Sequence, residues 1–136
     1  KTVDHLAFMV GDNPACEVTL FHVGANLTNF RRPELAPAED QDLEEQLKAL
    51  DRRQMSAFTA RALDILAEGG IKPSRVRVCL NQNGDSVSRA ILVEARRGDY
   101  GTVVIGRRGH GQSFFMGHVS DRIVGKGADL AVWVVG

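Results

Sequence analysis

Short apolar segments alternate with longer segments of helical periodicity along the whole chain, and this alternation constrains the fold more than any other feature. Residues 18–23 (Val-Thr-Leu-Phe-His-Val) are rich in β-branched and aromatic side chains and predict an interior strand covered on both faces. Residues 102–105 and 130–135 are continuously apolar and predict two further buried strands. Apolar and polar residues alternate over residues 76–80, which predicts an edge strand with one apolar face and one exposed face.

Between these segments the apolar residues recur at helical spacing. Residues 3–10 predict a first helix, and residues 39–67 predict a long helix that the glycines at 69–70 end. Residues 87–95 and 119–124 predict two more helices. The residues expected to face the sheet are Leu43, Leu47, Leu50, Phe58, Ala62, Ile65 and Leu66 on the long helix, Val87, Ile91 and Ala95 on the third, and Val119, Ile123 and Val124 on the last.

The predicted order is a helix followed by a strand, repeated four times. Such alternation is typical of an α/β fold in which right-handed crossovers build an open parallel sheet with helices on both faces. A chain of 136 residues has room for one domain of this kind. Open parallel sheets bind ligands beyond the carboxyl ends of their strands, so we expect the functional site there.

Charge and composition argue against several classes of function. Seventeen Lys and Arg residues balance seventeen Asp and Glu residues, so bulk charge predicts binding neither to nucleic acid nor to an anionic membrane. No apolar segment approaches the roughly 18 to 20 residues that cross a bilayer. Cys16 and Cys79 fit neither a redox pair nor a zinc-ligand spacing, which favours a reducing, cytoplasmic location.

A glycine-rich segment directly follows the strand predicted at residues 102–105. Gly106, Gly109 and Gly111 lie close together, and Gly117 comes soon after them. Glycine allows the main chain to approach a ligand without a Cβ atom, and the free amides of a following helix attract anions. The spacing matches neither GxxxxGK[ST] nor GxGxxG. The segment alone therefore leaves open a phosphate site or a turn that carries glycine for steric reasons.

Taken together, these segments resemble the universal stress protein family. Residues 103–109 (Val-Val-Ile-Gly-Arg-Arg-Gly), residues 115–120 (Phe-Met-Gly-His-Val-Ser) and the final strand at 131–135 look like the C-terminal third of that family. Residues 17–23 resemble its second strand, and residues 83–85 with the following helix are similar to its third helix. The resemblance covers nearly the whole chain.

The resemblance implies an adenine nucleotide α-hydrolase-like fold, in which five parallel strands are ordered 3-2-1-4-5. The first strand of the family would precede Lys1, so the single domain over residues 1–136 is expected to lack its N-terminal strand. The resemblance also implies a homodimer joined through the last strand, Leu130 to Val135, where Trp133 would face either the core or the partner subunit.

The resemblance further implies a site for an adenine nucleotide, with ATP as the expected ligand and Mg²⁺ accompanying it. Nucleotide-binding members carry GxxGx₉G followed by Ser or Thr, and this loop wraps the triphosphate. Val23 would contact adenine through its main chain, Ile105 would lie on the adenosine side, and two arginines would pair with phosphate oxygens. The residues expected to bind the nucleotide are Val23, Ile105, Gly106, Arg107, Arg108, Gly109, Gly117, His118 and Val119.

Two features depart from the family pattern. Seven residues, rather than nine, separate Gly109 from Gly117, and His118 stands where the family has a hydroxyl residue. Both departures lower the expected affinity for ATP. No catalytic residue and no metal-ligand set is predicted, so ATP hydrolysis is expected to be slow at most.

Three hypotheses about function remain at this point. The first is a non-catalytic stress-response protein that binds ATP or another adenine nucleotide. The second is a dimeric interaction module in which the glycine segment only turns the chain. The third is an enzyme similar to ATP pyrophosphatases, whose Ser-Gly-Gly-x-Asp-Ser loop would precede Lys1.

Overall fold

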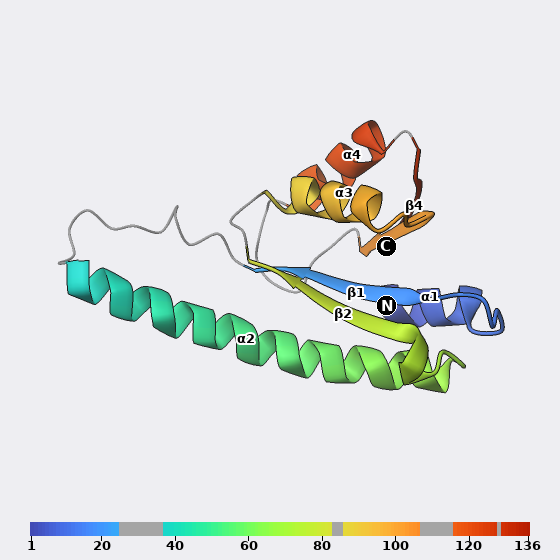
Figure 1. Ribbon diagram of the computed structural model, residues 1–136, viewed down its shortest axis with the longest axis horizontal. Helices are drawn as coiled ribbons and strands as arrows, with labels where there is room; N and C mark the ends of the chain where they lie inside the picture. Colours follow the sequence, from blue (N-terminus) through green and yellow to red (C-terminus); the bar gives the residue numbers. More distant parts are fainter. Residues whose placement is uncertain (25–36, 83–85, 107–115, 128) are drawn as a thin grey trace.

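The computed structural model describes residues 1–24, 37–82, 86–106, 116–127 and 129–136. The predicted alternation of helices and strands is confirmed (Figure 1). The first and last residues of each predicted strand lie within one residue of those observed. The elements are α1 (Thr2–Val10), β1 (Val18–Val23), α2 (Pro37–Glu68), the 3-10 helix η2 (Pro73–Arg75), β2 (Val76–Asn81), α3 (Val87–Arg97), β3 (Thr102–Gly106), α4 (Met116–Lys126) and β4 (Ala131–Val135).

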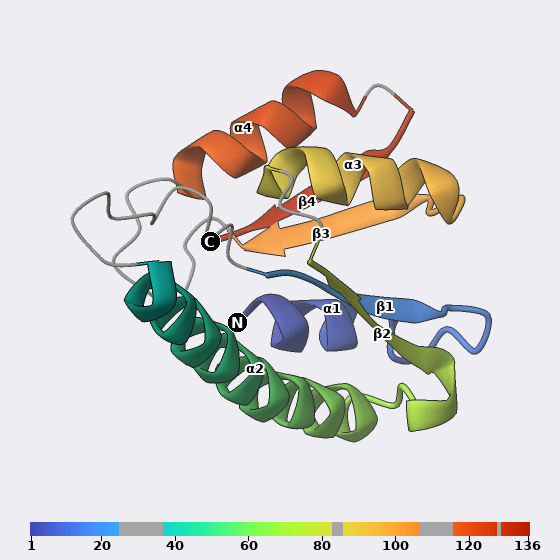
Figure 2. The ribbon, with the colours of Figure 1, turned by 60° about the vertical axis from the view of Figure 1, so that its left-hand side comes forward.

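The strands form two parallel pairs. β1 pairs with β2, with Val18 opposite Val76, and β3 pairs with β4, with Thr102 opposite Ala131. All four strands run in the same direction (Figure 2). Within the described parts of the chain no strand hydrogen-bonds to both pairs, so the order 3-2-1-4-5 and the interior position of β1 stay predictions.

The helices lie on both sides of the strands. α1 and α2 lie on one side, and α3 and α4 lie on the other (Figures 1 and 2). α1 also contacts β3, and α3 contacts β1, so each strand pair touches helices from both halves of the chain. The hydroxyl of Tyr100, just before β3, donates a 2.8 Å hydrogen bond to Oγ1 of Thr19 in β1. This bond joins the two pairs near the start of their strands.

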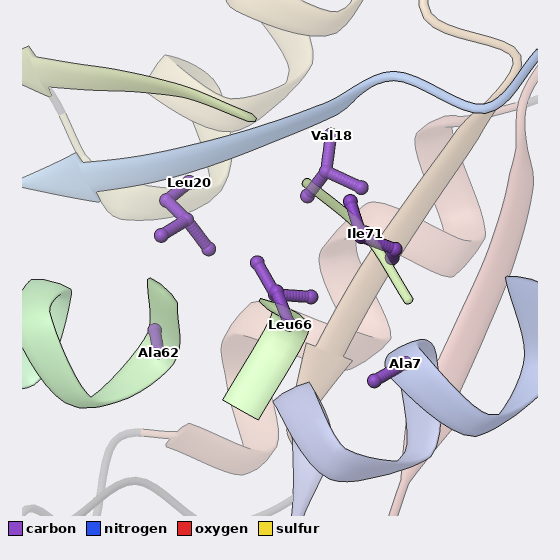
Figure 3. Packing of buried hydrophobic residues seen from close by; sticks show 6 residues of the cluster. All are labelled: Ala7, Val18, Leu20, Ala62, Leu66 and Ile71. Atoms are coloured by element: carbon purple, nitrogen blue, oxygen red, sulfur yellow. The ribbon is translucent and has the colours of Figure 1, made fainter. Parts of the chain in front are cut away.

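The largest apolar core lies between β1 and the helices α1 and α2. Its buried side chains point toward one another from the three elements and from the turn that follows α2 (Figure 3). They are Ala7, Val18, Leu20, Ala62, Leu66 and Ile71. Because Val18 and Leu20 of β1 pack with Ala62 and Leu66 of α2, burial of these side chains holds the end of α2 against β1.

The two glycines after α2 end the helix as predicted. Gly70 adopts a φ of +93°, a backbone conformation that favours glycine. Its amide donates to the carbonyl of Ala67 at 3.0 Å, and the amide of Ile71 donates to the carbonyl of Leu66 at 2.8 Å. This is a Schellman motif, and its apolar contact is supplied by Leu66 and Ile71, both fully buried. The motif turns the chain from α2 toward β2.

Several helical residues predicted to face the core are exposed instead. Leu50 and Phe58 are exposed because only the last turns of α2 pack against α1 and β1. Val87 at the start of α3 and Val124 on α4 are exposed as well, whereas Ile123 is fully buried. The periodicity correctly predicted the helices but not the length over which each one is covered.

The strands also differ from the predicted burial. Val78 and Leu80 are exposed because the core is built on β1, and β2 adds only Val76 to that packing. No residue of β3 or β4 is buried, although residues 102–105 and 130–135 were expected to be. From residue 86 onward the buried side chains belong to α3 and α4, which pack on each other.

Candidate functional site

The carboxyl ends of β1 and β3 lie at the same edge of the strand layer, because the strands run in parallel (Figure 2). β1 ends at Val23 and β3 ends at Gly106. In open α/β sheets this is the edge that binds ligands. The predicted nucleotide residues therefore come from elements that converge on one side of the molecule.

At the end of β1, Val23 is half-buried and lies opposite Asn81 of β2. The amide of Gly24 donates a 2.7 Å hydrogen bond to the carbonyl of Asn81. This bond extends the pairing of β1 and β2 past their last residues and holds Val23 at the edge. The contact of Val23 with adenine stays a prediction.

A histidine and an aspartate that the sequence analysis did not assign meet beside this position. Nε2 of His22 in β1 lies 3.5 Å from Oδ1 of Asp51 in α2. The Nε2 atom is buried and makes no hydrogen bond within the described structure. The pair gives the end of β1 an imidazole and a carboxylate that can exchange hydrogen bonds with a polar ligand. No spacing rule links a residue in a strand to one on a distant helix, so the sequence carried no signal for this pair.

The end of β3 and the start of α4 carry the other described site residues. Ile105 and Gly106 are half-buried at the end of β3. Gly117 and His118 belong to the first turn of α4, and half-buried Val119 follows them. The first amides of a helix lack intrahelical partners, and they attract anions.

Three predicted phosphate contacts, Arg107, Arg108 and Gly109, lie outside the described residues. Their contacts stay predictions, and so do any contacts made by the side chain of His118. The structure therefore positions the two ends of the predicted glycine loop, β3 and α4, and does not test the path between them.

Two cavities among the described residues are lined by none of the predicted nucleotide-binding residues. One of about 430 Å³ lies between α3 and α4, and another of about 180 Å³ lies between the end of α3 and the start of β4. The described part of the chain brings no three His, Cys, Asp or Glu side chains close enough to hold a metal ion. Nor does any helix there combine the length and apolar character needed to cross a membrane.

A family model described as the universal stress protein family matches residues 1–136. The chain belongs to the universal stress protein family. A comparison with curated proteins gives no match. The family match confirms the resemblance, and the four helices and parallel strands fit the adenine nucleotide α-hydrolase-like fold of universal stress proteins. Members of the family are generally non-catalytic stress proteins.

Proposed function

We propose that this universal stress protein binds an adenine nucleotide, with ATP as the expected ligand, and acts in the cytoplasm without catalysing a reaction. The observation that carries the proposal is the convergence of β1, β3 and the first turn of α4 on one edge of the strand layer (Figure 2). This arrangement can offer main chain to an adenine base and free amides to phosphates.

The roles of the site residues follow from their positions. The main chain at Val23 meets adenine, Ile105 covers the adenosine, and the loop that starts at Gly106 surrounds the phosphates together with Arg107 and Arg108. Any Mg²⁺ is held chiefly by phosphate oxygens, because the described residues provide no cluster of three metal-ligating side chains.

The absence of catalysis is proposed from the surroundings of His22. Among the described residues its Nε2 atom lies near Asp51, and no serine or cysteine hydrogen-bonds to that atom as a nucleophile would. The pair is therefore suited to binding rather than to covalent chemistry.

We also propose that the two strand pairs belong to one five-stranded sheet with the order 3-2-1-4-5. An additional strand would lie between β1 and β3, whose facing edges pair with nothing in the described chain. Filling these edges would satisfy main-chain donors and acceptors that native sheets do not leave exposed.

Equilibrium dialysis with labelled ATP tests the nucleotide proposal. Wild-type protein should retain ATP, and Gly106→Val and Gly109→Val should each weaken retention by roughly tenfold or more, because a side chain then occupies the path of the phosphates. Gly101→Ala is the matched control, since a Cβ atom there meets nothing within 4 Å.

Two outcomes would contradict the proposal. Wild-type protein that retains no nucleotide would favour the dimeric interaction module, a hypothesis supported by the short spacing after Gly109 and by His118 in place of a hydroxyl residue. Retention that survives both valine substitutions would place the nucleotide elsewhere.

We also propose that the protein forms a homodimer through its last strand, as the family resemblance implies. β4 pairs on one side with β3, Trp133 is half-buried, and Val134 is exposed. Light scattering should give at least twice the chain mass of 14.8 kDa for wild type and a lower mass for Val134→Lys, because a charge would then enter the strand interface. A wild-type protein of single-chain mass would contradict it.

A further inference from the structure

The cavity between α3 and α4 concentrates positive charge. Four cationic side chains line it: Arg89 and Arg96 from α3, and Arg122 and Lys126 from α4. Among the residues that the structure describes, no carboxylate lines it. We call this cavity, together with the apolar side chains in its wall, the cationic groove.

A hydrogen bond between α3 and α4 stabilises the groove, and part of its wall is apolar. Nη2 of Arg96 donates a 3.3 Å hydrogen bond to the carbonyl of Lys126, which links the end of α3 to the end of α4. Leu92 and Val93 contribute apolar wall, and Val93 is 53% exposed. A complementary partner would therefore present acidic groups beside an apolar stripe.

The first part of α2 carries that combination. We call residues 41–58 the outer segment of α2. Leu43, Leu47, Leu50 and Phe58 fall on one face of it, and Leu50 and Phe58 are 52% and 50% exposed. The start of α2 extends beyond the end of the β1–β2 pair (Figure 1), and from Asp51, which lies beside His22, the helix runs alongside β1.

Acidic residues flank the first turns of this apolar stripe, whereas Arg52 and Arg53 follow in its later turns. Asp42 and Glu44 lie about 100° to either side of Leu43, since successive helical residues are separated by about 100°. Asp42 is exposed, and Glu44 pairs with Lys48 on the surface of the same helix. With Glu39 and Asp40 just before them, these residues make the start of α2 strongly acidic, although the chain as a whole carries no net charge.

The outer segment cannot reach the groove of its own chain while the core is intact. Ala62 and Leu66 anchor the end of α2 in the core on one side of the strands. The groove lies on the other side, between α3 and α4 (Figures 1 and 2). The matching groove is therefore available only on a second copy.

We propose that the outer segment of α2 from one copy docks in the cationic groove of a second copy as a third helix beside α3 and α4. An amphipathic helix in a groove buries its apolar face, and the acidic flanks then meet Arg122 and Lys126. This contact uses surfaces distinct from β4, and it does not depend on nucleotide binding.

A charge exchange between the two surfaces tests the proposal by sedimentation velocity at low salt. The groove variant carries Arg122→Glu and Lys126→Glu, which leave the carbonyl that Arg96 contacts in place. The helix variant carries Asp42→Lys and Glu44→Lys, which removes the half-exposed ion pair between Glu44 and Lys48, an interaction of small energetic value. Each variant alone should self-associate about tenfold more weakly than wild type, because its groove and helix then carry charges of the same sign.

Mixing the two variants should restore association. The acidic helix of the groove variant then meets the basic groove of the helix variant, and the basic helix of the helix variant meets the acidic groove of the groove variant. The matched control is Lys72→Glu with Arg77→Glu, which changes net charge equally at exposed positions outside the groove and should associate like wild type. A dimer through β4 would survive in every variant, so the readout is the change in mass relative to wild type.

Several outcomes would overturn the proposal. Normal association of the groove variant together with loss in the helix variant would show that α2 pairs with α2. A mixture of correctly folded variants that stays dissociated would exclude the contact. Wild-type protein that does not self-associate through these surfaces, but binds heparin through Arg122 and Lys126, would assign the groove to another anion.

Discussion

The β1–β2 and β3–β4 pairs have the same parallel geometry but are stabilised in different ways. Val18 and Leu20 of β1 are buried in a core shared with α1 and α2, whereas no residue of β3 or β4 is buried. The core of the second half lies on its helices, where Ala90, Ala95 and Ile123 are covered. In this protein the buried strand residues are those of β1, the strand on which α1 and α2 pack.

The largest expected effect is a difference in the free energy of unfolding between substitutions in the two cores. Leu66→Ala should lower the free energy of unfolding by about 4 kcal/mol, because it leaves a cavity in a closely packed cluster. Ile123→Ala should cost about 2 kcal/mol, since α3 and α4 bury fewer large side chains than the core around Leu66 does. Both residues are fully buried in the wild-type protein, so denaturant unfolding compares packing rather than exposure.

Leu50→Ala on the exposed part of α2 is the control, and it should change the free energy of unfolding by no more than about 0.5 kcal/mol. Equal losses for Leu66→Ala and Ile123→Ala would show that the two cores are packed alike.

A smaller effect comes from the close approach of α1 and the end of α2. A Cβ atom on Gly11 would overlap the main-chain carbonyl oxygen of Gly69, which cannot move aside as a side chain can. Gly11→Ala should therefore destabilise the protein by about 2 to 3 kcal/mol. Gly101→Ala before β3 should change stability by less than about 0.5 kcal/mol, because no atom lies within 4 Å of the added Cβ. Thermal unfolding of the two variants measures the difference, and similar melting temperatures would refute the close approach.

The smallest effect concerns the link between the strand pairs. Tyr100→Phe removes the hydroxyl that donates to Thr19 and should cost about 1 kcal/mol of unfolding free energy. A double-mutant cycle with Thr19→Val should give a coupling energy of at least about 0.5 kcal/mol. Additive effects of the two substitutions would mean that the bond does not connect the two pairs in solution.

The order and type of the elements could be predicted from sequence because they depend on local patterns. The end of α2 at Gly69 and Gly70 is an example, since a glycine at positive φ is required by the Schellman motif itself. The strand ends were similarly accurate because β-branched residues cluster within them and turn residues follow.

Burial and side-chain partners could not be predicted, because they depend on what lies across from each element. Phe58 and Leu80 fit apolar stripes, yet they are exposed where no helix or strand of the described chain covers them. His22 and Asp51 meet only because α2 packs beside β1. Val23, Ile105 and Gly106 lie at the ends of β1 and β3, and their role in binding stays a prediction, while Arg107, Arg108 and Gly109 lie outside the described residues.

The central claim is that the ends of β1 and β3 form one nucleotide site despite belonging to separate strand pairs. Hydrogen exchange with and without Mg²⁺ and ATP measures this directly at residues 18–24 and 102–106. We predict that ATP slows amide exchange in both segments together, with the same dependence on ATP concentration. Protection of one segment alone, or of neither, would contradict the claim.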